Sequence, residues 1–477
     1  MHALVIGEYH IVLVTTAVFV KTESITKRSI VNRATVILTE FEDFENDVTN
    51  TVNSVLKHAS NVSVQVVTNR VPYPPLRNLP QVKQISLQTS PNASFLDSHP
   101  ESFIHSPFVV FVPDGTEVVR NDVVEYMIKY LETHSTSAVR LAAWGLDGSP
   151  ARCVNLEFRL KEWTLKYSTI DSLSDCSALI DGKFVMIIRT LDLYLLADPF
   201  AAPFHKAIFM QTTLKGWKIA FDHTHLFTDQ KNLFQKPHHL WKHKNSEKSQ
   251  LKNIYSRFGI KLIEHHDGTT EWFGCNKQSA RCFPTILGDM PDYLYKGRWT
   301  PPCCLNAIRT TARHVFRILE SQNVRYWLEG GSLLGAARNG DIIPWDYDVD
   351  IGVYRDDIKK SQHLLSALAE PYLDDESFVW ERAPEGDFFR VQYSSSNHLH
   401  VDIFPFYSKN GIMTKDSWMK GHRQDMEFPE SYLQPLVKIP FVGLQASAPN
   451  HWRQFLEMKF GPGVIEHPRY PDANVVR

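Results

Sequence analysis

The sequence carries almost no net charge. Its 51 lysines and arginines are matched by 53 aspartates and glutamates, which leaves a formal net charge of −2. A general nucleic-acid-binding protein presents a basic face, so this balance argues against nucleic acid as a partner. Internal repeats and low-complexity tracts are also lacking. With 477 residues, of which 43% are hydrophobic, the chain has enough apolar material for two or three domains with real cores.

No uninterrupted apolar run reaches membrane-spanning length. The apolar stretch from Tyr9 to Val20 is extended by Leu4 to Gly7, but Glu8 and His10 interrupt it. A transmembrane helix takes about 20 consecutive apolar residues. We predict a signal anchor and linker in residues 1–33, with a cleaved signal peptide or a buried first strand as alternatives.

Cysteine is scarce, and the six that are present fall into two groups. Cys153 and Cys176 are expected to form a disulfide if the chain is secreted, and two buried free thiols are the alternative. The sequons at Asn61 and Asn92 fit the same secretory route as glycosylation sites.

The second group holds four cysteines in 30 residues, namely Cys275, Cys282, Cys303 and Cys304. Four thiolates are the ligand set of a structural zinc site, but the spacing is irregular and includes an adjacent pair. Two disulfides explain the same residues in an oxidising compartment. The residues alone leave both possibilities open.

The first half of the chain alternates strand and helix patterns. Strands are predicted at Thr35–Leu38, Val62–Val67 and Phe108–Val112, and helices at Phe44–Lys57 and Val118–His134. This alternation predicts an α/β domain over residues 34–270 with a mostly parallel sheet. The domain invites comparison with nucleotide-sugar glycosyltransferases, but only Asp114 stands at a strand end, and one carboxylate is poor metal ligation. We therefore expect a structural or acceptor-positioning role for it.

The most informative segments lie in residues 271–477, which we take as the second domain. Gly330 and Gly331 would let the backbone approach a phosphate closely, and Ser332 is expected to cap a helix that starts there. The segment from Trp345 to Ile351 then places three aspartates at alternate positions, Asp346, Asp348 and Asp350. On a strand these side chains would share one face.

Clustered carboxylates need a cation. The apolar neighbours of the triplet indicate partial burial; they are Ile342, Ile343, Val349, Ile351 and Val353. Buried carboxylates are costly without a partner, and Mg²⁺ or Mn²⁺ bridging to phosphate oxygens is the usual solution. A plain turn and a solvated acidic loop are the alternatives for the two segments taken singly.

A further carboxylate, Asp402, lies between apolar neighbours in a later predicted strand. We expect it to act as a third metal ligand or as a general base. His398 and His400 beside it are assigned to shape or hydrogen bonding, because Mg²⁺ prefers oxygen ligands.

This combination of a Gly–Ser turn, an acidic strand and a later strand acid resembles the nucleotidyltransferase fold. Three segments are similar to the LicD/fukutin family, namely Trp327–Gly335, Asp341–Asp348 and His400–Asp402. Three more indicate one branch of that family: Tyr293–Cys304, Asp387–Tyr393 and Phe460–Gly463. The resemblance covers about residues 270–477 and is looser in the first half.

The resemblance implies an enzyme that transfers a phospho-alcohol from a CDP-activated donor. For this branch it implies transfer of ribitol 5-phosphate from CDP-ribitol to the phosphorylated O-mannosyl glycan of α-dystroglycan, with release of CMP. It also implies a homo-oligomer in the Golgi membrane, single-pass type II with a lumenal catalytic domain. Secretion and the endoplasmic reticulum are alternative locations.

The resemblance also implies roles for individual residues. Asp346, Asp348 and Asp350 match the metal-binding acids, and the four-cysteine group matches a zinc loop, which favours zinc over disulfides there. Matching donor-binding positions are Gly331, Ser332, Arg338, Trp345, Asp346, Tyr347, Asp348, Val349, Asp350, Gln424, Asp425, His467, Pro468 and Arg469.

The expected mechanism is in-line attack by an acceptor hydroxyl on the ribitol-bearing phosphorus, with Mg²⁺ on the aspartates neutralising the pyrophosphate. Arg338 is expected to stabilise phosphate charge, with a structural salt bridge as its alternative. The residues alone do not distinguish CDP-ribitol from CDP-glycerol or CDP-choline as the donor. A non-catalytic glycan-binding scaffold is the remaining possibility, although a scaffold has no need of three like charges in one pocket.

Overall fold

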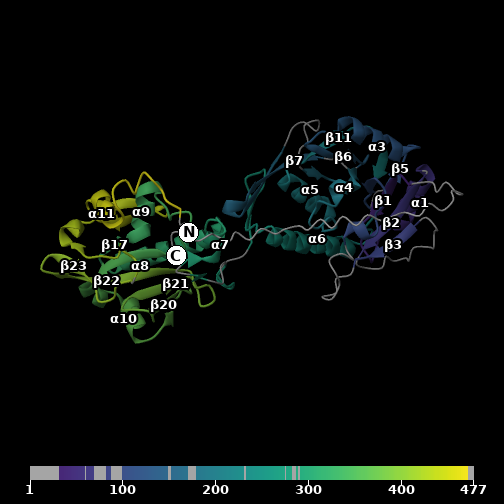
Figure 1. The fold of residues 1–477 in the computed structure, drawn as a ribbon. Helices are drawn as coiled ribbons and strands as arrows, with labels where there is room; N and C mark the ends of the chain where they lie inside the picture. The colour runs from purple at the N-terminus through teal and green to yellow at the C-terminus, as the bar shows by residue number, and fades with distance from the viewer. Residues whose placement is uncertain are drawn as a thin grey trace, which may run out of the picture.

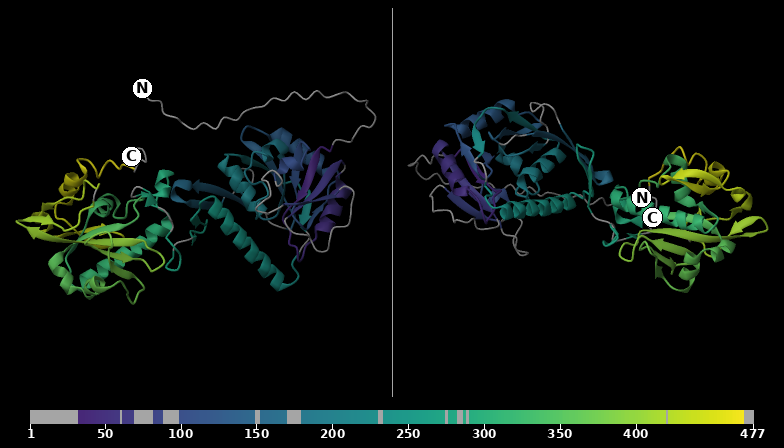
Figure 2. Two further views of the ribbon diagram at one scale, coloured as in Figure 1. Left: turned by 60° about the horizontal axis from the view of Figure 1, so that its bottom comes forward. Right: turned by 180° about the vertical axis from the view of Figure 1, so that it is seen from behind.

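Two lobes joined by a narrow waist make up the molecule (Figure 1). The computed structural model describes residues 32–59, 61–68, 82–87, 99–148, 152–169, 179–229, 233–273, 276–281, 286–287, 290–419 and 421–470. Residues 32–273 form the N-terminal lobe and residues 290–470 the C-terminal lobe (Figure 2). The signal anchor predicted in residues 1–33 falls almost wholly outside the described residues. Among the described helices, none combines the length and apolar character needed to cross a membrane.

A seven-stranded sheet organises the N-terminal lobe, in the order β11-β6-β10-β4-β1-β2-β3. Its strands are β1 (Ala34–Leu38), β2 (Val62–Thr68), β3 (Val82–Ser86), β4 (Phe108–Phe111), β6 (Val139–Gly145), β10 (Phe184–Arg189) and β11 (Lys218–Asp222). The predicted parallel pairing is found for β1 with β2 and β4, β2 with β3, and β6 with β11. Only β10 runs antiparallel to both of its neighbours in this sheet.

Helices cover both faces of this sheet. The helices are α1 (Val48–His58), α3 (Val123–His134), α4 (Thr190–Leu193), α5 (Phe204–Leu214) and α6 (Pro237–Arg257), with the short 3₁₀ turn η1 at Pro100–Ser102. Alternate residues of each strand enter opposite cores: Val36 packs with α1 and α3, whereas Ile37 packs with α4, α5 and the end of α6. Because both faces of these strands are buried, each strand is a short continuous apolar run in the sequence.

A second sheet, in the order β14-β13-β8-β7-β9, leads toward the waist. It comprises β7 (Arg152–Arg159), β8 (Thr164–Thr169), β9 (Leu179–Asp181), β13 (Leu262–Glu264) and β14 (Thr270–Trp272), while β5 (Thr116–Val118) pairs separately with β12 (Phe227–Asp229). The predicted domain boundary at 270/271 falls inside β14. The turn η2 (Leu160–Glu162) between β7 and β8 reaches the other lobe, where Trp163 Nε1 donates to Trp299 O at 2.8 Å.

The C-terminal lobe is built on a mixed sheet in the order β17-β18-β22-β21-β20-β19. Its strands are β17 (Tyr326–Leu328), β18 (Val349–Tyr354), β19 (Tyr372–Leu373), β20 (Val379–Arg382), β21 (Phe389–Gln392) and β22 (His400–Lys409), continued by β23 (Ile412–Thr414) and β24 (Phe428–Pro429). β18 and β22 pair in parallel, and their register sets Asp350 opposite Asp402. The sheet therefore brings together two acids that lie far apart in the sequence.

Helices and two small hairpins complete this lobe. They are α7 (Asp292–Tyr295), α8 (Pro302–Ser321), α9 (Gly330–Asn339), η4 (Arg355–Lys360), α10 (Gln362–Ala369), η5 (Glu430–Leu433) and α11 (Trp452–Phe460), with the hairpins β15 (Ile286–Leu287)–β16 (Met290–Pro291) and β25 (Val437–Phe441)–β26 (Leu444–Ala448). The apolar stripe of α8, with Ile308, Val315 and Phe316, packs into the same core as the fully buried Trp327 and Trp380.

The described cysteines are all disulfide-bonded: Cys153 on β7, and Cys303 and Cys304 in the first turn of α8. Zinc is bound by cysteine thiolates, and a cystine sulfur is not a thiolate. At Cys303 and Cys304 the structure therefore agrees with the alternative of disulfides and does not support the predicted zinc site. Cys176, Cys275 and Cys282 lie outside the described residues, so the Cys153–Cys176 pairing stays a prediction. Of the two sequons, Asn61 is exposed and Asn92 lies outside the described residues.

Candidate active site

The glycine–serine turn connects β17 to α9. Glu329 is the N-cap of the helix, and its Oε2 accepts a hydrogen bond from Gly330 N at 3.2 Å. The prediction that Ser332 caps this helix is therefore wrong. Ser332 lies inside the first turn, and its Oγ accepts a hydrogen bond from Asp350 N at 2.9 Å. The serine thus fastens the start of α9 to β18.

The three aspartates gather in a way the sequence pattern did not foresee. Because β18 begins at Val349, only Asp350 lies in the strand, and the expectation of one strand face for all three is wrong. Asp346 and Asp348 occupy the preceding turn, where Asp346 N donates to Ile343 O at 2.8 Å. Their side chains nevertheless meet, since Asp346 and Asp348 are hydrogen-bonded to each other.

Burial and mutual repulsion hold protons on this cluster. Desolvation, followed by the charge of Asp350, raises the pKa of Asp346 to about 7. Desolvation raises the pKa of Asp348 well above its usual value, and the charges of Asp346 and Asp402 add to this effect. The pKa of Asp350 is likewise raised, by desolvation first and then by Asp348 and Asp402. Two carboxyl groups that share a proton form a ready pair of oxygen ligands once a cation replaces that proton.

Gly331 allows the helix to approach the aspartates. A Cβ atom at this position would lie 2.7 Å from Asp346 Oδ2, closer than carbon and oxygen tolerate. The sequence suggested that this glycine leaves room for a phosphate, whereas the structure shows that it leaves room for the carboxylate.

Gly331→Ala is therefore expected to displace the Asp346 carboxylate and lower the transfer rate by about 100-fold, because small misplacements at a reacting centre are costly. The measurement is the steady-state rate of the phospho-alcohol transfer that the sequence predicts, alongside circular dichroism to verify folding. Gly443→Ala is the control: Gly443 has a φ of +81° in open space. That control strains the β25–β26 turn and should lower the thermal midpoint without changing the rate. Equal rates for Gly331→Ala and wild type would contradict this reading of the glycine.

Asp402 is clamped by an arginine that sequence reasoning missed. Arg390 Nε and Nη2 donate to Asp402 Oδ1 and Oδ2 at 2.8 and 3.0 Å. Arg390 and Asp402 face each other in the β21–β22 register. Burial lowers the pKa of Arg390, but ion pairing with Asp402 and Glu385 outweighs this effect and raises it. Because Arg390 engages both of its oxygens, Asp402 balances the charge of the Arg390 guanidinium beside the aspartates. The only sequence signal was an arginine between aromatic residues in Asp387–Tyr393.

A second missed cation is Lys415, which is 6% exposed. Its Nζ lies 2.8 Å from Asp425 Oδ1, and its charge acts on Asp350, where it opposes the rise in pKa. Asp425 was expected at the donor site, and Lys415 connects it to the aspartate cluster. Asp425 also accepts a hydrogen bond from Met419 N, and its neighbour Gln424 is half-buried.

Arg338 has a structural role in the described chain. Its Nη2 and Nε donate to the carbonyl oxygens of Val464 and Ile465 at 2.5 and 3.2 Å. These bonds hold the C-terminal turn against α9, and they are neither a phosphate contact nor the salt bridge considered as its alternative. The predicted donor residues His467, Pro468 and Arg469 follow this turn and are exposed.

Trp345 forms an aromatic wall beside the aspartates. Its ring centroid lies 5.4 Å from that of Tyr470 and 6.2 Å from that of Trp299. Thr300 Oγ1 donates to Asp346 O at 2.6 Å, which ties the turn to the segment before α8. Lys161 of the N-terminal lobe lies over the Trp299 and Tyr470 rings, at 5.0 and 5.2 Å from their centroids. The N-terminal lobe thus packs behind this wall.

Two other residues predicted to contact the donor, Tyr347 and Val349, differ in how deeply they are buried. Tyr347 is half-buried and its N–H donates to Asp346 Oδ1 at 3.1 Å, whereas the Val349 side chain is fully buried in the core. His400 Nδ1 lies 2.9 Å from His398 O, and His398 Nδ1 pairs with Gln392 Oε1. Both histidines therefore make hydrogen bonds.

The aspartates fit a magnesium ion by donor type. In the part of the chain that the structure describes, no three or more histidine, cysteine or acidic side chains converge as a complete metal site. Mg²⁺ does not require such a cage, since it is commonly held by one or two carboxylates together with substrate phosphates and water. The hydrogen-bonded pair Asp346–Asp348 supplies two carboxylates, and Asp350 lies close enough to raise the pKa of Asp346.

Two family models match the chain in succession. Residues 21–266 match the fukutin-related protein stem domain. Residues 323–451 match the LicD/FKTN/FKRP nucleotidyltransferase domain, which holds the turn, the aspartates and Asp402.

Curated relatives resemble the chain over most of its length. The mouse (Mus musculus) ribitol 5-phosphate transferase FKRP is 48% identical over 442 residues, covering 92% of this chain and 89% of that protein. The human (Homo sapiens) protein of the same name is 47% identical over 442 residues, covering 92% and 88%. The human ribitol-5-phosphate transferase FKTN is 25% identical over 162 residues, covering 32% of this chain and 33% of that protein.

Proposed function

Because the chain belongs to the fukutin-related protein branch of the LicD/fukutin family, we propose that it is a ribitol 5-phosphate transferase. The single observation that carries the proposal is the hydrogen-bonded Asp346–Asp348 pair at the N-terminus of α9, inside the matched nucleotidyltransferase domain. A half-buried acidic pair of this kind has a chemical use when a cation and a phosphate ester occupy it. The relatives' names supply ribitol 5-phosphate as the transferred group.

In the proposed reaction the donor is CDP-ribitol and the acceptor is a glycan hydroxyl. The hydroxyl oxygen bonds to the ribitol-bearing phosphorus, the bond from that phosphorus to the CMP oxygen breaks, and CMP leaves. Asp346 and Asp348 would hold a divalent cation, Mg²⁺ or Mn²⁺, which supplies charge neutralisation at the pyrophosphate. The side chains of Lys415 and Arg390 add positive charge around the acidic cluster.

The acceptor proton needs an oxygen that can take it. Both oxygens of Asp402 are engaged by Arg390, whereas the Asp350 side chain has no arginine partner among the described residues. Burial raises the pKa of Asp350, so its carboxylate, once ionised, binds a proton more tightly than an ordinary aspartate does. We therefore propose that Asp350 accepts the proton of the acceptor hydroxyl, and that Asp402 positions Arg390.

The proposal extends to the biological setting on family resemblance alone. The acceptor is the phosphorylated O-mannosyl glycan of α-dystroglycan, and the enzyme acts in the Golgi lumen as an oligomer anchored by its N-terminal segment. The four-cysteine zinc loop belongs to the same expectation, but the disulfides at Cys303 and Cys304 oppose it. Zinc analysis and thiol titration of the unreduced, chelator-treated protein distinguish one zinc per chain from two cystines.

The pKa of Asp346 predicts a pH-dependent response to metal. Its folded-state value of about 7 lies above the ordinary 3.8, so ionisation costs the fold stability. Metal-free protein should lose thermal stability as pH rises from about 4 to about 7. Mg²⁺ displaces the proton, so its stabilising effect should grow over the same interval and level off above it. Differential scanning fluorimetry with and without Mg²⁺ measures this, and a metal effect independent of pH would contradict it.

A donor panel tests the function itself. CDP-ribitol, CDP-glycerol and CDP-choline are compared for CMP release with a phosphorylated O-mannosyl glycopeptide, in the presence of Mg²⁺. We expect release with CDP-ribitol to exceed that with the other donors. Preference for CDP-glycerol or CDP-choline would assign a different donor, and failure to bind any of the three would favour the glycan-binding scaffold.

A further inference from the structure

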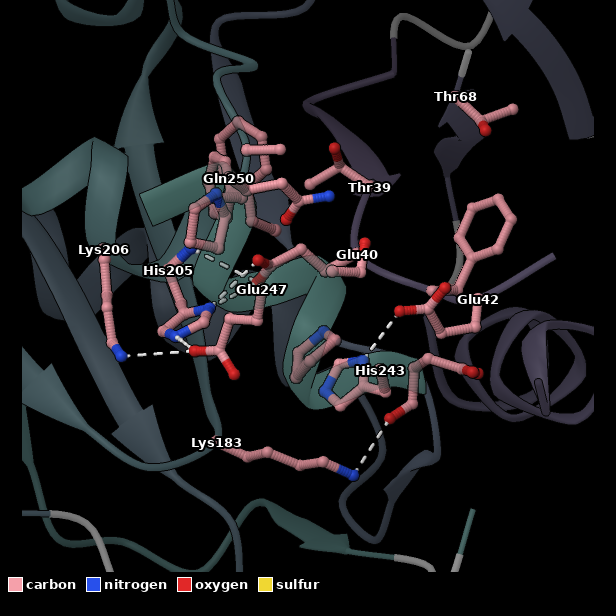
Figure 3. A pocket seen from close by; sticks show the side chains of 18 of the residues that line it. Thr39, Glu40, Glu42, Thr68, Lys183, His205, Lys206, His243, Glu247 and Gln250 are labelled. Carbon is pink, nitrogen blue, oxygen red and sulfur yellow. Dashed lines mark hydrogen bonds and ion pairs between the residues drawn. The ribbon is translucent and has the colours of Figure 1, made fainter. Parts of the chain in front are cut away.

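The N-terminal lobe has a cavity of its own, which we name the N-lobe pocket (Figure 3). Its volume of about 510 Å³ is that of a small-molecule site. The segments after two parallel neighbours, Thr39–Asp43 after β1 and Val112–Asp114 after β4, line it together with parts of α5 and α6.

The pocket lies where the strand order reverses. From β1 the chain continues outward to β2 and β3 on one side, whereas β4 lies on the other side of β1. The carboxyl ends of β1 and β4 diverge into loops at this point and leave a crevice between them. In open α/β sheets, ligands bind in this crevice.

One wall of the pocket is aromatic. Phe111 at the end of β4 and Phe204 at the start of α5 are stacked with ring centroids 4.4 Å apart, and Phe200 packs against Phe111 at 6.3 Å. Flat apolar surfaces of this kind pack against the C–H faces of a ligand.

The polar part of the lining is rich in hydrogen-bond acceptors. Thr39, Glu40, Glu247 and Gln250 all line the pocket, and Figure 3 shows the Glu247 carboxylate turned toward His205 and Lys206. The lining acids outnumber the lining lysines and histidines: Glu40, Glu42, Asp43, Asp114, Asp181 and Glu247 against Lys183, Lys206, His205 and His243.

The lysines of the lining are already paired. Lys206 Nζ lies 3.2 Å from Glu247 Oε1, and Lys183 Nζ lies 2.7 Å from Asp229 Oδ1. Neither ammonium group is left to bind a phosphate without first breaking an ion pair.

The histidines are paired in the same way. His205 Nδ1 lies 3.0 Å from Glu40 Oε1, and its Nε2 lies 3.4 Å from Glu247 Oε1. These carboxylates raise the pKa of His205 to about 9, against the opposing effect of burial. His243 Nδ1 lies 2.7 Å from Glu42 Oε1. Among the described residues, every lysine and histidine that lines the pocket therefore has a carboxylate partner.

We propose that the N-lobe pocket binds a neutral, hydroxyl-rich ligand of the sugar or polyol class. His205 and Lys206 pair with Glu247 Oε1, so ligand hydroxyl groups donate to Glu247 Oε2 and to the Gln250 amide oxygen. The C–H face of the ligand packs on Phe111 and Phe204. An anionic ligand is disfavoured because the acids are in excess and the cations are paired. This site lies in a different lobe from Asp346 and Asp348, and the proposal does not rest on the proposed transferase activity.

The test uses the full chain and a pair of matched tryptophan variants on α6. Ser246→Trp places an indole in the pocket, because Ser246 is a half-buried lining residue. Lys248→Trp places the same group on the exposed side of the helix, since Lys248 is exposed and does not line the pocket. Saturation-transfer NMR titrations with ribitol, xylose, mannose and glucose measure binding, and inorganic phosphate and CMP serve as anionic probes.

We expect saturable binding of at least one neutral probe to the wild type and to Lys248→Trp, weakened about tenfold or more in Ser246→Trp. Asp348→Asn, which alters the other site, should leave this binding unchanged. Thermal unfolding verifies that Ser246→Trp is folded, and Gln250→Ala is a second, smaller change with the same expected direction.

Three results would overturn the proposal. One is the absence of saturable binding by any neutral probe. Another is binding that survives in both Ser246→Trp and Gln250→Ala, or that is lost in Asp348→Asn. The third is binding of phosphate or CMP that Ser246→Trp abolishes, because this would make the pocket an anion site.

Discussion

Replacing Asp348 with asparagine is expected to reduce ribitol phosphate transfer by about 1,000-fold or more, on the scale of losing a group that stabilises transition-state charge. The side chain keeps its size but loses the charge that, with Asp346, would hold the cation at the pyrophosphate. Fold stability should not fall in parallel. The half-buried Asp348 carboxyl is desolvated and lies near the charges of Asp346 and Asp402, so its ionisation is unfavourable and its pKa is raised. The metal-free variant is therefore expected to unfold at the same temperature as the wild type or higher.

The combination of these two effects is diagnostic. A residue needed only for folding would lose activity and stability together, whereas a metal ligand loses activity alone. Asp356→Asn is the matched control, since Asp356 is an exposed acid in η4. It should leave both the CMP-release rate and the thermal midpoint unchanged. Retained turnover of CDP-ribitol by Asp348→Asn would refute the assignment of the site.

Lys459→Met is expected to destabilise the C-terminal lobe by about 3–5 kcal/mol, the cost of leaving one partner of a buried ion pair uncompensated. Lys459 Nζ lies 2.6 Å from Glu329 Oε2, and their side chains are 2% and 8% exposed. Glu329 also caps α9 and accepts a hydrogen bond from Trp327 Nε1 at 2.9 Å. Losing the lysine thus leaves a buried carboxylate at the helix that carries Gly331.

A double-mutant cycle separates the pair from simple loss of packing. Glu329→Gln keeps the shape of the acid and its acceptor oxygen, so Glu329→Gln/Lys459→Met should be more stable than Lys459→Met alone. Urea unfolding of the four proteins gives the coupling energy. Additive effects would show that the two groups do not interact in the folded state, contrary to the geometry. Lys438→Met is the control, because its pair with Glu320 is half exposed and should contribute little.

Much of the N-terminal lobe could be predicted from the sequence, because its strands are short apolar runs and its helices are amphipathic. The strand predicted at Thr35–Leu38 is β1, and the helix predicted at Phe44–Lys57 is α1, although it starts later, at Val48. The orientation of β10 could not be predicted. An apolar strand buried on both faces has the same pattern in either direction, and only the paths of its connections decide which neighbours it runs against.

Predicting the site succeeded where neighbours in the sequence are neighbours in space. The Gly–Ser turn and the three aspartates do converge, as expected. Prediction failed for Arg390 and Lys415, because a buried cation is recognised by the acid it faces, and those acids come from other strands and loops. The role of Ser332 was missed for a similar reason, since its partner is the backbone N–H of Asp350.

Residue types and their spacing were enough to predict the chemistry of this protein: oxygen ligands grouped at one turn, glycines that permit a close approach, and the family to which these motifs belong. These are properties of residue type and spacing, which survive without coordinates. Only the folded arrangement fixes which acids are paired with a cation of the chain and which remain free to bind a metal ion or accept a proton. The parallel pairing of β18 with β22 sets Asp402 opposite Asp350, and the pairing of β21 with β22 places Arg390 on Asp402. Charge balance at short range depends on register and burial, and both are fixed only when distant strands pair.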